Sequence, residues 1–399
     1  MAKDINPPRG MRDFLPAEKA KRERVLAVIR GVYESFGFQE IEAPALEDLD
    51  RLLSGQGGDN EKLAYRVLKR GAELDQALAD GSNPDGLADL GLRFDLTVPL
   101  TRFYATNRSE LPNVFKAIQI GPVWRAERPQ KGRYRQFVQC DIDIIGDAGV
   151  LAEVELITAS LAALDALGLK NAVIRVNHRE LLTKLLSGFG VKAEQLTQAM
   201  IIIDKLDKIA VSGVVQELEE KLGTEVSAKA KQWFDTLDVQ VVPEILQGLF
   251  AVAGGNRLRF DPTLVRGMGY YTGVIFEIEL PGSGSSIGGG GRYDGMVGKW
   301  LGSDVPAVGI SLGFERVIDL VEDTKAGSGV VLVLEDESSQ VLKIALEYQK
   351  ELIGHGLSVR LELTPKRLNL LLESMKANGF DRFALVSADG ANEELKSID

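Results

Sequence analysis

The stretch FKAIQIGPVWRAERPQKGRYRQFVQCDIDIIG, residues 115–146, decides the fold, because it predicts two strands joined by a short basic loop. Two sets of side chains alternate along its second arm: Phe137, Gln139, Asp141 and Asp143 on one face, and Val138, Cys140, Ile142 and Ile144 on the other. Alternation with a period of two residues is typical of an antiparallel strand that is covered on one face. The hairpin therefore predicts a sheet with one apolar and one polar face.

The polar face of this hairpin combines arginines with carboxylates. In the first arm, Arg125 and Glu127 are expected on the same side as Val123, and further arginines occupy the loop. Arginines that face carboxylates across a concave sheet predict a ligand with both a phosphate and an amino group. The alternative is a surface hairpin in which the charges only form salt bridges with one another.

The segment ERPQKGRYRQF, followed by QCDIDIIG, resembles motif 2 of the class II aminoacyl-tRNA synthetases, in the form found in histidyl-tRNA synthetases. The resemblance implies that Arg125 contacts the ATP α-phosphate and the substrate carboxylate. It also implies that Arg133 binds the terminal phosphate, and that Glu127 and Phe137 hold and stack the adenine. The loop would then meet the acceptor end of tRNA through Gln130 and the lysine that follows it, Lys131.

Two later segments extend this resemblance to the phosphate side of a nucleotide site. LVRGMGYYTGVIFEIEL, residues 264–280, resembles the histidine-specific motif RGLDYYTG, although Gly269 stands where Asp is frequent. The resemblance implies that Arg266 acts as an electrostatic catalyst beside the α-phosphate. GFER resembles motif 3 and implies that Arg316 holds the γ-phosphate. Outside this context, one arginine at the start of a helix is an ordinary surface residue.

A second set of residues is implied for the amino acid. RFDLTVPLTR, residues 93–102, resembles the segment that holds the substrate amino group, and a carboxylate suits an ammonium group. Taken alone, its aspartate is equally an ordinary strand-end residue. Both imidazole nitrogens of histidine are polar, so each needs a polar partner in the site. The implied histidine-binding residues are Asp95, Thr97 and Gln139 around the amino group, Asp143 and Tyr271 at the imidazole, and Tyr293.

The glycine-rich stretch GSGSSIGGGGRYDGMV, residues 282–297, is not a Walker A phosphate loop, because no Lys-Ser/Thr pair follows the glycines. GGRYD resembles a second histidine-specific motif, which is the reason for including Tyr293 in the site. A glycine-rich turn without a ligand role is the alternative.

Composition excludes several classes of protein. The chain has 399 residues, of which 45% are hydrophobic and 26% charged, as is typical of globular proteins. No apolar run approaches the roughly 18 residues that span a bilayer, and the N-terminus lacks the apolar core of a signal peptide. One cysteine and two histidines make a structural zinc site unexpected, and a single cysteine fits a reducing cytoplasm. His178 and His355 are expected at helix ends or in loops.

The chain is long enough for several domains. We expect an α/β protein: residues 1–325 would form a class II catalytic domain, an antiparallel sheet flanked by helices, with a mainly helical insertion at 171–256. The insertion would lie over the tRNA acceptor stem, or its charges would simply be a solvated helix face. Residues 323–329 are expected to be a linker.

A βαβαβ order over residues 329–399 predicts a small α/β unit that is similar to an anticodon-binding domain. Thr364-Pro365 is expected to cap a helix that runs to about Asn378. The unit holds eight Lys and Arg against twelve Asp and Glu, which is unfavourable for strong RNA binding. We expect it to be shortened, because the resemblance implies a further strand and helix.

Together the resemblances imply an enzyme that activates L-histidine with ATP, accompanied by Mg²⁺, and transfers it to tRNA-His. The segment GFQEIEAPALE, residues 37–47, resembles motif 1 and implies a homodimer, although Pro44 is equally a simple strand terminator. The alternative is a non-catalytic, histidine-binding paralogue, the regulatory subunit of ATP phosphoribosyltransferase. A third possibility is a domain that activates histidine but handles tRNA poorly.

Overall fold

The computed structural model describes residues 5–53, 63–83, 86–130, 132–253, 255–266, 269–322, 329–392 and 394–398. Two compact units are distinguished: residues 27–321 together with the first twelve residues, and residues 322–399 together with 13–26. The expected linker lies outside the described residues except at its last position, Gly329, which begins a strand.

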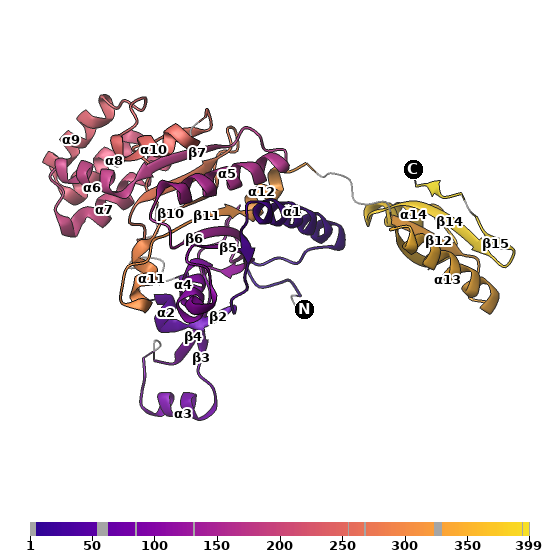
Figure 1. Ribbon diagram of the computed structural model, residues 1–399. Helices are drawn as coiled ribbons and strands as arrows, with labels where there is room; N and C mark the ends of the chain where they lie inside the picture. The colour runs from indigo at the N-terminus through magenta and orange to yellow at the C-terminus, as the bar shows by residue number, and fades with distance from the viewer. Residues whose placement is uncertain are drawn as a thin grey trace. The chain divides into compact units, whose positions relative to one another are not determined.

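An eight-stranded sheet forms the centre of the larger unit (Figure 1). Its order is β1 (Gln39–Glu40), β5 (Phe115–Trp124), β6 (Gln136–Ile145), β11 (Ala307–Gly313), β10 (Ser286–Arg292), β9 (Val274–Glu279), β7 (Val173–His178) and β8 (Leu258–Phe260). The outer pairs β1–β5 and β7–β8 are parallel, and the pairs between them are antiparallel. The expected antiparallel-rich sheet is therefore confirmed.

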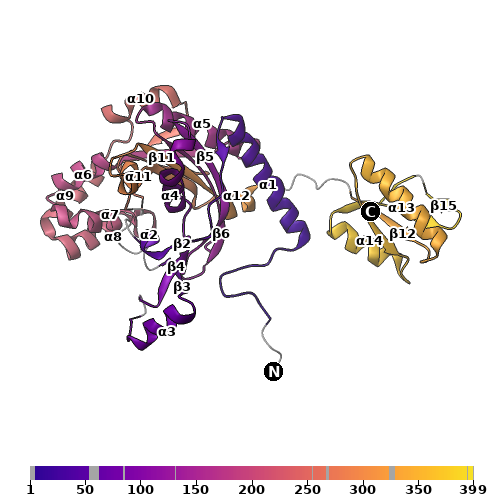
Figure 2. The same ribbon diagram turned by 60° about the horizontal axis from the view of Figure 1, so that its bottom comes forward.

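Helices cover this sheet, and their apolar faces decide which side becomes the core. Helices α5 (Val150–Ala166) and α12 (Phe314–Leu320) pack on the strands β6 and β11 (Figure 2). On β6, Cys140, Ile142 and Ile144 are fully buried. The alternation along this strand therefore separates a packed apolar face from a polar face, as the sequence predicts.

The first arm of the hairpin corrects one detail of the sequence interpretation. Strand β5 ends at Trp124, so Arg125 and Glu127 lie beyond the strand rather than on its polar face. The regular ladder ends here because the Arg135 N–H donates to the carbonyl of Gly10 and the Ala126 N–H donates to the carbonyl of Leu63, each at 2.8 Å, instead of to the opposite arm of the hairpin.

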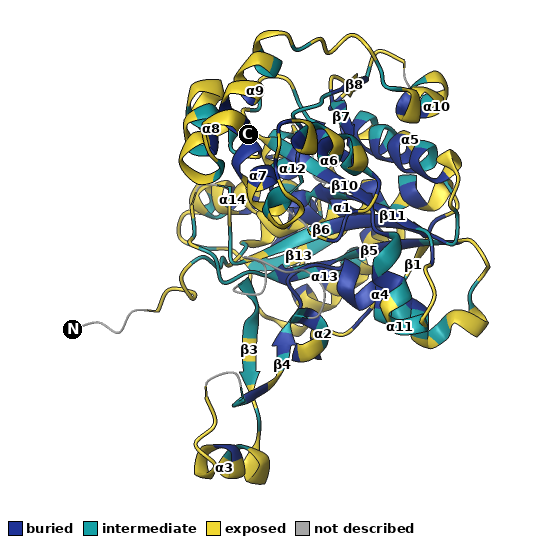
Figure 3. Ribbon diagram, turned by 90° about the vertical axis from the view of Figure 1, so that its left-hand side faces the viewer, coloured by how far each residue is buried: buried dark blue, intermediate teal, exposed yellow. Residues whose placement is uncertain are grey.

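Further elements flank the sheet. They are α1 (Pro16–Ser35), α2 (Leu49–Leu53), α4 (Thr97–Asn107), α11 (Asp294–Leu301) and a small sheet of β2 (Leu46–Asp48), β4 (Ala88–Leu92) and β3 (Tyr65–Leu68), with α3 (Gly71–Ala79) after β3. Figure 3 shows that buried residues concentrate in the central strands and in α4 and α5, whereas α3 is largely exposed.

The middle of the chain is mainly helical, but the expected insertion boundary needs correction. Its helices are α6 (Arg179–Gly188), α7 (Leu196–Ile203), α8 (Leu206–Leu222), α9 (Thr224–Asp235) and α10 (Glu244–Ala253). Strand β7 falls within the expected range 171–256, yet it pairs with β9 in the large sheet. Composition does not reveal this, because a short amphipathic strand next to a helix has no distinctive residue content.

The second unit has a five-stranded sheet, with β13 (Ser358–Leu363), β12 (Gly329–Leu334) and β14 (Phe380–Ser387) parallel, and with short antiparallel strands β15 (Gly390–Ala391) and β16 (Lys396–Ser397). Helices α13 (Ser339–Gly354) and α14 (Leu368–Ala377) belong to separate apolar clusters on this sheet. The expected βαβαβ order is confirmed.

The expected cap of α14 is wrong. The Thr364 hydroxyl donates to the carbonyl of Leu334 at 2.8 Å, and the helix begins only at Leu368. Thr364 therefore ties the end of β13 to β12, and it lies three residues before Arg367, which occupies the N-cap position of the helix.

Candidate active site

One cavity of about 710 Å³ opens on the polar face of the large sheet. All the residues that the sequence predicts to bind ATP or histidine line this cavity: Asp95, Thr97, Arg125, Glu127, Arg133, Phe137, Gln139, Asp143, Arg266, Tyr271, Tyr293 and Arg316. Gln130 does not line it; its backbone pairs with Arg133 in the hairpin loop. Lys131 lies outside the described residues. Residues far apart in the chain therefore meet at one site.

Four arginines form the cationic end of the cavity. The Arg125 Nε donates to the Phe94 carbonyl at 3.0 Å, and its guanidinium lies 5.1 Å from the centroid of the Phe137 ring. Arg133 is 3.5 Å from the Glu127 carboxylate, and Arg316 donates to the Ser286 carbonyl. These contacts fix each guanidinium by one edge and leave the cluster suited to an anion.

The electrostatics of Arg316 show how closely the positive charges gather. Burial lowers the pKa of Arg316, and the neighbouring Arg133 lowers that pKa further, with a smaller contribution from Arg266. Guanidinium groups stay charged at neutral pH, so this repulsion is a cost that a bound polyanion would relieve.

Three buried aspartates, which together we call the carboxyl end of the cavity, also line it. Asp95, Asp141 and Asp143 are 1%, 4% and 3% exposed. Burial raises the pKa of Asp143 to about 7, with the hydrogen bond from Tyr293 opposing this rise and Asp95 adding to it. Burial and the nearby Asp143 raise the pKa of Asp141 well above its usual range. A cationic or proton-donating ligand would stabilise the ionised forms.

Hydrogen bonds orient this end of the site. The Tyr293 hydroxyl donates to Asp143 Oδ1 at 2.6 Å, and the Gln139 amide donates to Ser311 Oγ at 3.2 Å. Among the described residues, Gln139 Oε1 is buried without a partner. A buried acceptor of this kind costs free energy until a ligand donates to it.

The glycine run is a strand at the centre of the sheet, and the glycine-rich turn is therefore wrong as an alternative. A Cβ on Gly309 would lie 1.8 Å from Asp143 Oδ1, and a Cβ on Gly289 would lie 2.8 Å from Arg266 Cζ. A Cβ on Gly291 would lie 2.8 Å from the Tyr271 ring. The glycines leave the space that the site side chains occupy.

The two histidines lie outside the cavity, at helix ends, as expected. The Nδ1 of His178 accepts a hydrogen bond from the Glu180 N–H at the start of α6, and His355 caps the end of α13.

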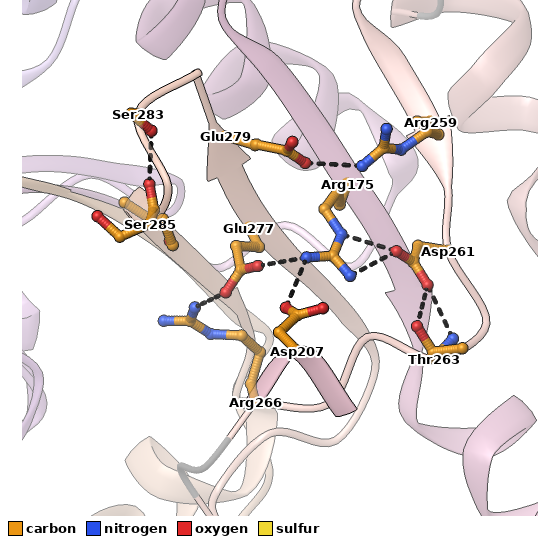
Figure 4. Close-up of polar contacts among 12 residues, drawn as sticks. Arg175, Asp207, Arg259, Asp261, Thr263, Arg266, Glu277, Glu279, Ser283 and Ser285 are labelled. Carbon is orange, nitrogen blue, oxygen red and sulfur yellow. Dashed lines mark hydrogen bonds and ion pairs between the residues drawn. The ribbon is translucent and has the colours of Figure 1, made fainter. Parts of the chain in front are cut away.

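Sequence reasoning missed Arg175 and Glu277, which also line the cavity. It placed Asp141 on the polar face of the hairpin with Gln139 and Asp143 but assigned it no role, and Asp141 lines the cavity as well. Arg175 and Glu277 meet across two strands that are distant in the sequence (Figure 4), and no local pattern predicts their pairing.

Comparisons with known proteins agree with this geometry. The sequence model of the family described as Histidyl-tRNA synthetase matches residues 10–317. A histidine–tRNA ligase of Leifsonia xyli subsp. xyli is 52% identical, over 98% of this chain and 97% of that protein. A histidine–tRNA ligase of Aeropyrum pernix is 38% identical, over 90% and 85% of the two chains.

Solved structures show the same fold. The crystal structure of histidyl-tRNA synthetase from Nostoc sp. PCC 7120 matches with a TM-score of 0.76 at 26% identity, over 97% of this chain and 92% of that one. The sheet and these matches define a class II aminoacyl-tRNA synthetase. Within that class, the chain belongs to the histidyl-tRNA synthetase family.

Proposed function

We propose that this chain is a histidine–tRNA ligase, which joins L-histidine to ATP and then transfers the histidyl group to the 3′ end of tRNA-His. The observation that carries this proposal is that Arg125, Arg133, Arg266 and Arg316 line one cavity together with three buried aspartates. A site that combines arginines with carboxyl groups suits a triphosphate beside a ligand with an ammonium group. Similarity to histidine–tRNA ligases over nearly the whole chain supports it.

In the first step, a carboxylate oxygen of histidine attacks the α-phosphorus of ATP, and the bond to pyrophosphate breaks. Both reactants are anions, so positioning and fixed positive charge supply most of the catalysis. Arg125 and Arg266 would stabilise the charge that develops on the α-phosphoryl oxygens. Arg133 and Arg316 would bind the terminal phosphate, and the adenine would stack against Phe137 beside Glu127.

Recognition of histidine would use the carboxyl end of the cavity. Asp143 and Tyr271 would meet the imidazole nitrogens, with Tyr293 fixing the Asp143 carboxyl through its 2.6 Å hydrogen bond. The amino group would lie among Asp95, Thr97 and Gln139. A different amino acid would leave these buried groups unpaired, which typically costs about 1–3 kcal/mol for each group.

ATP brings Mg²⁺ on its phosphates, and Mg²⁺ usually takes one or two protein carboxylates together with phosphate oxygens. The ion would neutralise phosphate charge, and Gln130 and Lys131 would contact the tRNA acceptor end.

The assembly and domain roles are part of the same proposal. A homodimer is supported by β1, which is the edge strand of the large sheet and is exposed at both residues. Residues 1–325 would be the catalytic domain, with the mainly helical insertion between β7 and β8, and residues 329–399 would contact the anticodon. Cys140 is free and buried, in keeping with the reducing cytoplasm. Among the described residues, no helix is long and apolar enough to cross a membrane.

The regulatory paralogue is the weaker alternative. A solved chain of Bacillus halodurans, described as an ATP phosphoribosyltransferase regulatory subunit/histidyl-tRNA synthetase, has a TM-score of 0.75 at 19% identity, over 97% and 99% of the two chains. At that identity the match shows a shared fold alone. The four arginines of the cavity favour a protein that uses ATP.

Histidine affinity is expected to fall as the pH is lowered through about 7, because the Asp143 carboxyl, with a pKa of about 7, becomes protonated and loses its charge. The imidazole of free histidine also titrates, near about 6.5. The Asp143→Asn variant has no titrating group at this position, so the pH dependence of its histidine affinity comes from the titration of the ligand. Calorimetric titrations between about pH 5.5 and 8.5 should give a steeper profile for the wild type. Parallel profiles would contradict this role of Asp143.

Charging of tRNA-His tests the whole reaction. We expect labelled histidine to reach tRNA-His and not a tRNA specific for another amino acid. Residues 329–399 carry more acidic than basic side chains, which is unfavourable for binding RNA phosphates. Adenylate formation should be measured beside charging. Normal adenylate formation with negligible transfer would contradict the second half of the reaction.

A further inference from the structure

A row of residues crosses three neighbouring strands beside the cationic end of the cavity. Arg175 on β7 is the direct cross-strand neighbour of Glu277 on β9, and Glu277 is opposite Gly289 on β10. Cross-strand neighbours lie close enough for their side chains to interact. The space above Gly289 is filled by the guanidinium of Arg266, since a Cβ on this glycine would approach Arg266 Cζ to 2.8 Å.

Glu277 joins the two arginines through separate oxygens (Figure 4). Its Oε2 accepts from Arg266 Nη1 at 3.1 Å, and its Oε1 accepts from Arg175 Nη1 at 2.9 Å. A charged hydrogen bond at each oxygen fixes the plane of the carboxylate as well as its position. Among the described residues, the Nε of Arg266 is buried without a partner, so Arg266 keeps a donor for a ligand.

Arg175 is itself held firmly. Its side chain is 12% exposed, and its Nη2 lies 2.6 Å from an Asp261 oxygen that also accepts from its Nε. Asp207, in the first turn of α8, adds a contact at 3.5 Å. A buried arginine with several carboxylate partners is an anchor for Glu277 and not a mobile surface charge.

We infer that Glu277, anchored by Arg175, is a positioning residue that holds the Arg266 guanidinium in the orientation needed at the α-phosphate. The inference rests on the proposed catalytic role of Arg266. An arginine side chain has several rotatable bonds, and its contribution to a developing charge depends on where the guanidinium lies before the reaction. Glu277 supplies this placement through its hydrogen bond with Arg266, and Gly289 provides the room for it.

The chain contains a matched control. Arg259 on β8 and Glu279 on β9, the two strands on either side of β7, form an ion pair of 2.7 Å, also visible in Figure 4. Arg259 is 50% exposed and neither residue lines the cavity. Glu277→Gln and Glu279→Gln thus remove the same charge from the same strand, and only the first loses a contact with Arg266.

The test is histidine-dependent ATP–pyrophosphate exchange. Glu277→Gln is expected to lower kcat by about tenfold to a hundredfold, the loss typical of a displaced catalytic group. The KM for histidine should stay within about twofold of wild type, because the carboxyl end of the cavity is unchanged. Glu279→Gln should behave as wild type. Arg175→Lys, which keeps the charge but loses the two-pronged geometry, should give a smaller fall in kcat and serves as the second variant.

A double-mutant cycle separates positioning from a general structural role. In an Arg266→Ala background, Glu277→Gln should cause no further loss, because nothing remains to be positioned. Equal activity of Glu277→Gln and Glu279→Gln, or a full further loss in the Arg266→Ala background, would overturn the inference while leaving the proposed function intact. Undiminished exchange by Arg266→Ala alone would instead overturn the role of Arg266, and the inference with it.

Discussion

Arg266→Ala should lower histidine-dependent ATP–pyrophosphate exchange by about 10²–10³-fold, the loss that follows removal of one preorganised donor to a developing oxyanion. The guanidinium lies beside the cavity, held 3.1 Å from Glu277, so little reorganisation is needed when charge develops. The fall should appear in kcat, because the interaction strengthens only in the transition state. Steady-state exchange rates at saturating ATP and histidine measure it.

Arg259→Ala is the control for Arg266→Ala, since Arg259 is an exposed arginine paired with Glu279. We expect it to retain the exchange activity of the wild type. Thermal unfolding of both variants should show that each folds. If both lose exchange equally, the effect of Arg266→Ala is structural and the catalytic role is wrong.

Gly309→Ala should weaken histidine binding by about tenfold to a hundredfold. The added Cβ would lie 1.8 Å from Asp143 Oδ1 and 2.7 Å from its Cγ, so the carboxyl must move. Its movement breaks the Tyr293 hydrogen bond and leaves buried polar groups unpaired, at a cost of about 1–3 kcal/mol. A change of about 1.4 kcal/mol in binding free energy corresponds to a tenfold change in affinity. Calorimetric titration with histidine measures this affinity directly.

The control for Gly309→Ala is Gly295→Ala in helix α11, where an added Cβ meets no other atom within 4 Å. This change should leave histidine affinity unaltered, and it removes the conformational freedom of a helical glycine. ATP binding should survive in Gly309→Ala, because the nearest atoms to the added Cβ belong to Asp143 and to the Ile142 carbonyl and not to any arginine of the cavity. Unchanged histidine affinity in Gly309→Ala would show that Asp143 is not part of the histidine site.

Much of the fold follows from local patterns. The alternation along β6 predicted which side chains pack inward, because a strand's period of two does not depend on its neighbours. The order of strands and helices in the smaller unit was predictable for the same reason. The site residues were located through motif resemblance, and the cavity brings them together. Their roles stay predictions until the variants are measured.

The features that the sequence did not predict correctly have a common physical origin. The end of β5 at Trp124 depends on hydrogen bonds from Arg135 to Gly10 and from Ala126 to Leu63, and Thr364 is hydrogen-bonded to a carbonyl on another strand. The pairing of Arg175 with Glu277 depends on strand register between distant segments. Each is a long-range contact, and periodicity in a short window contains no information about such contacts.

Exchange of pyrophosphate into ATP by the wild-type protein tests the central claim most directly, since it needs the arginines and the carboxyl groups to act in one cavity. We predict exchange that depends on histidine and is not supported by the other common amino acids. Histidine binding that is measurable by calorimetry, together with no exchange above background, would contradict the account and favour a histidine-binding regulatory protein.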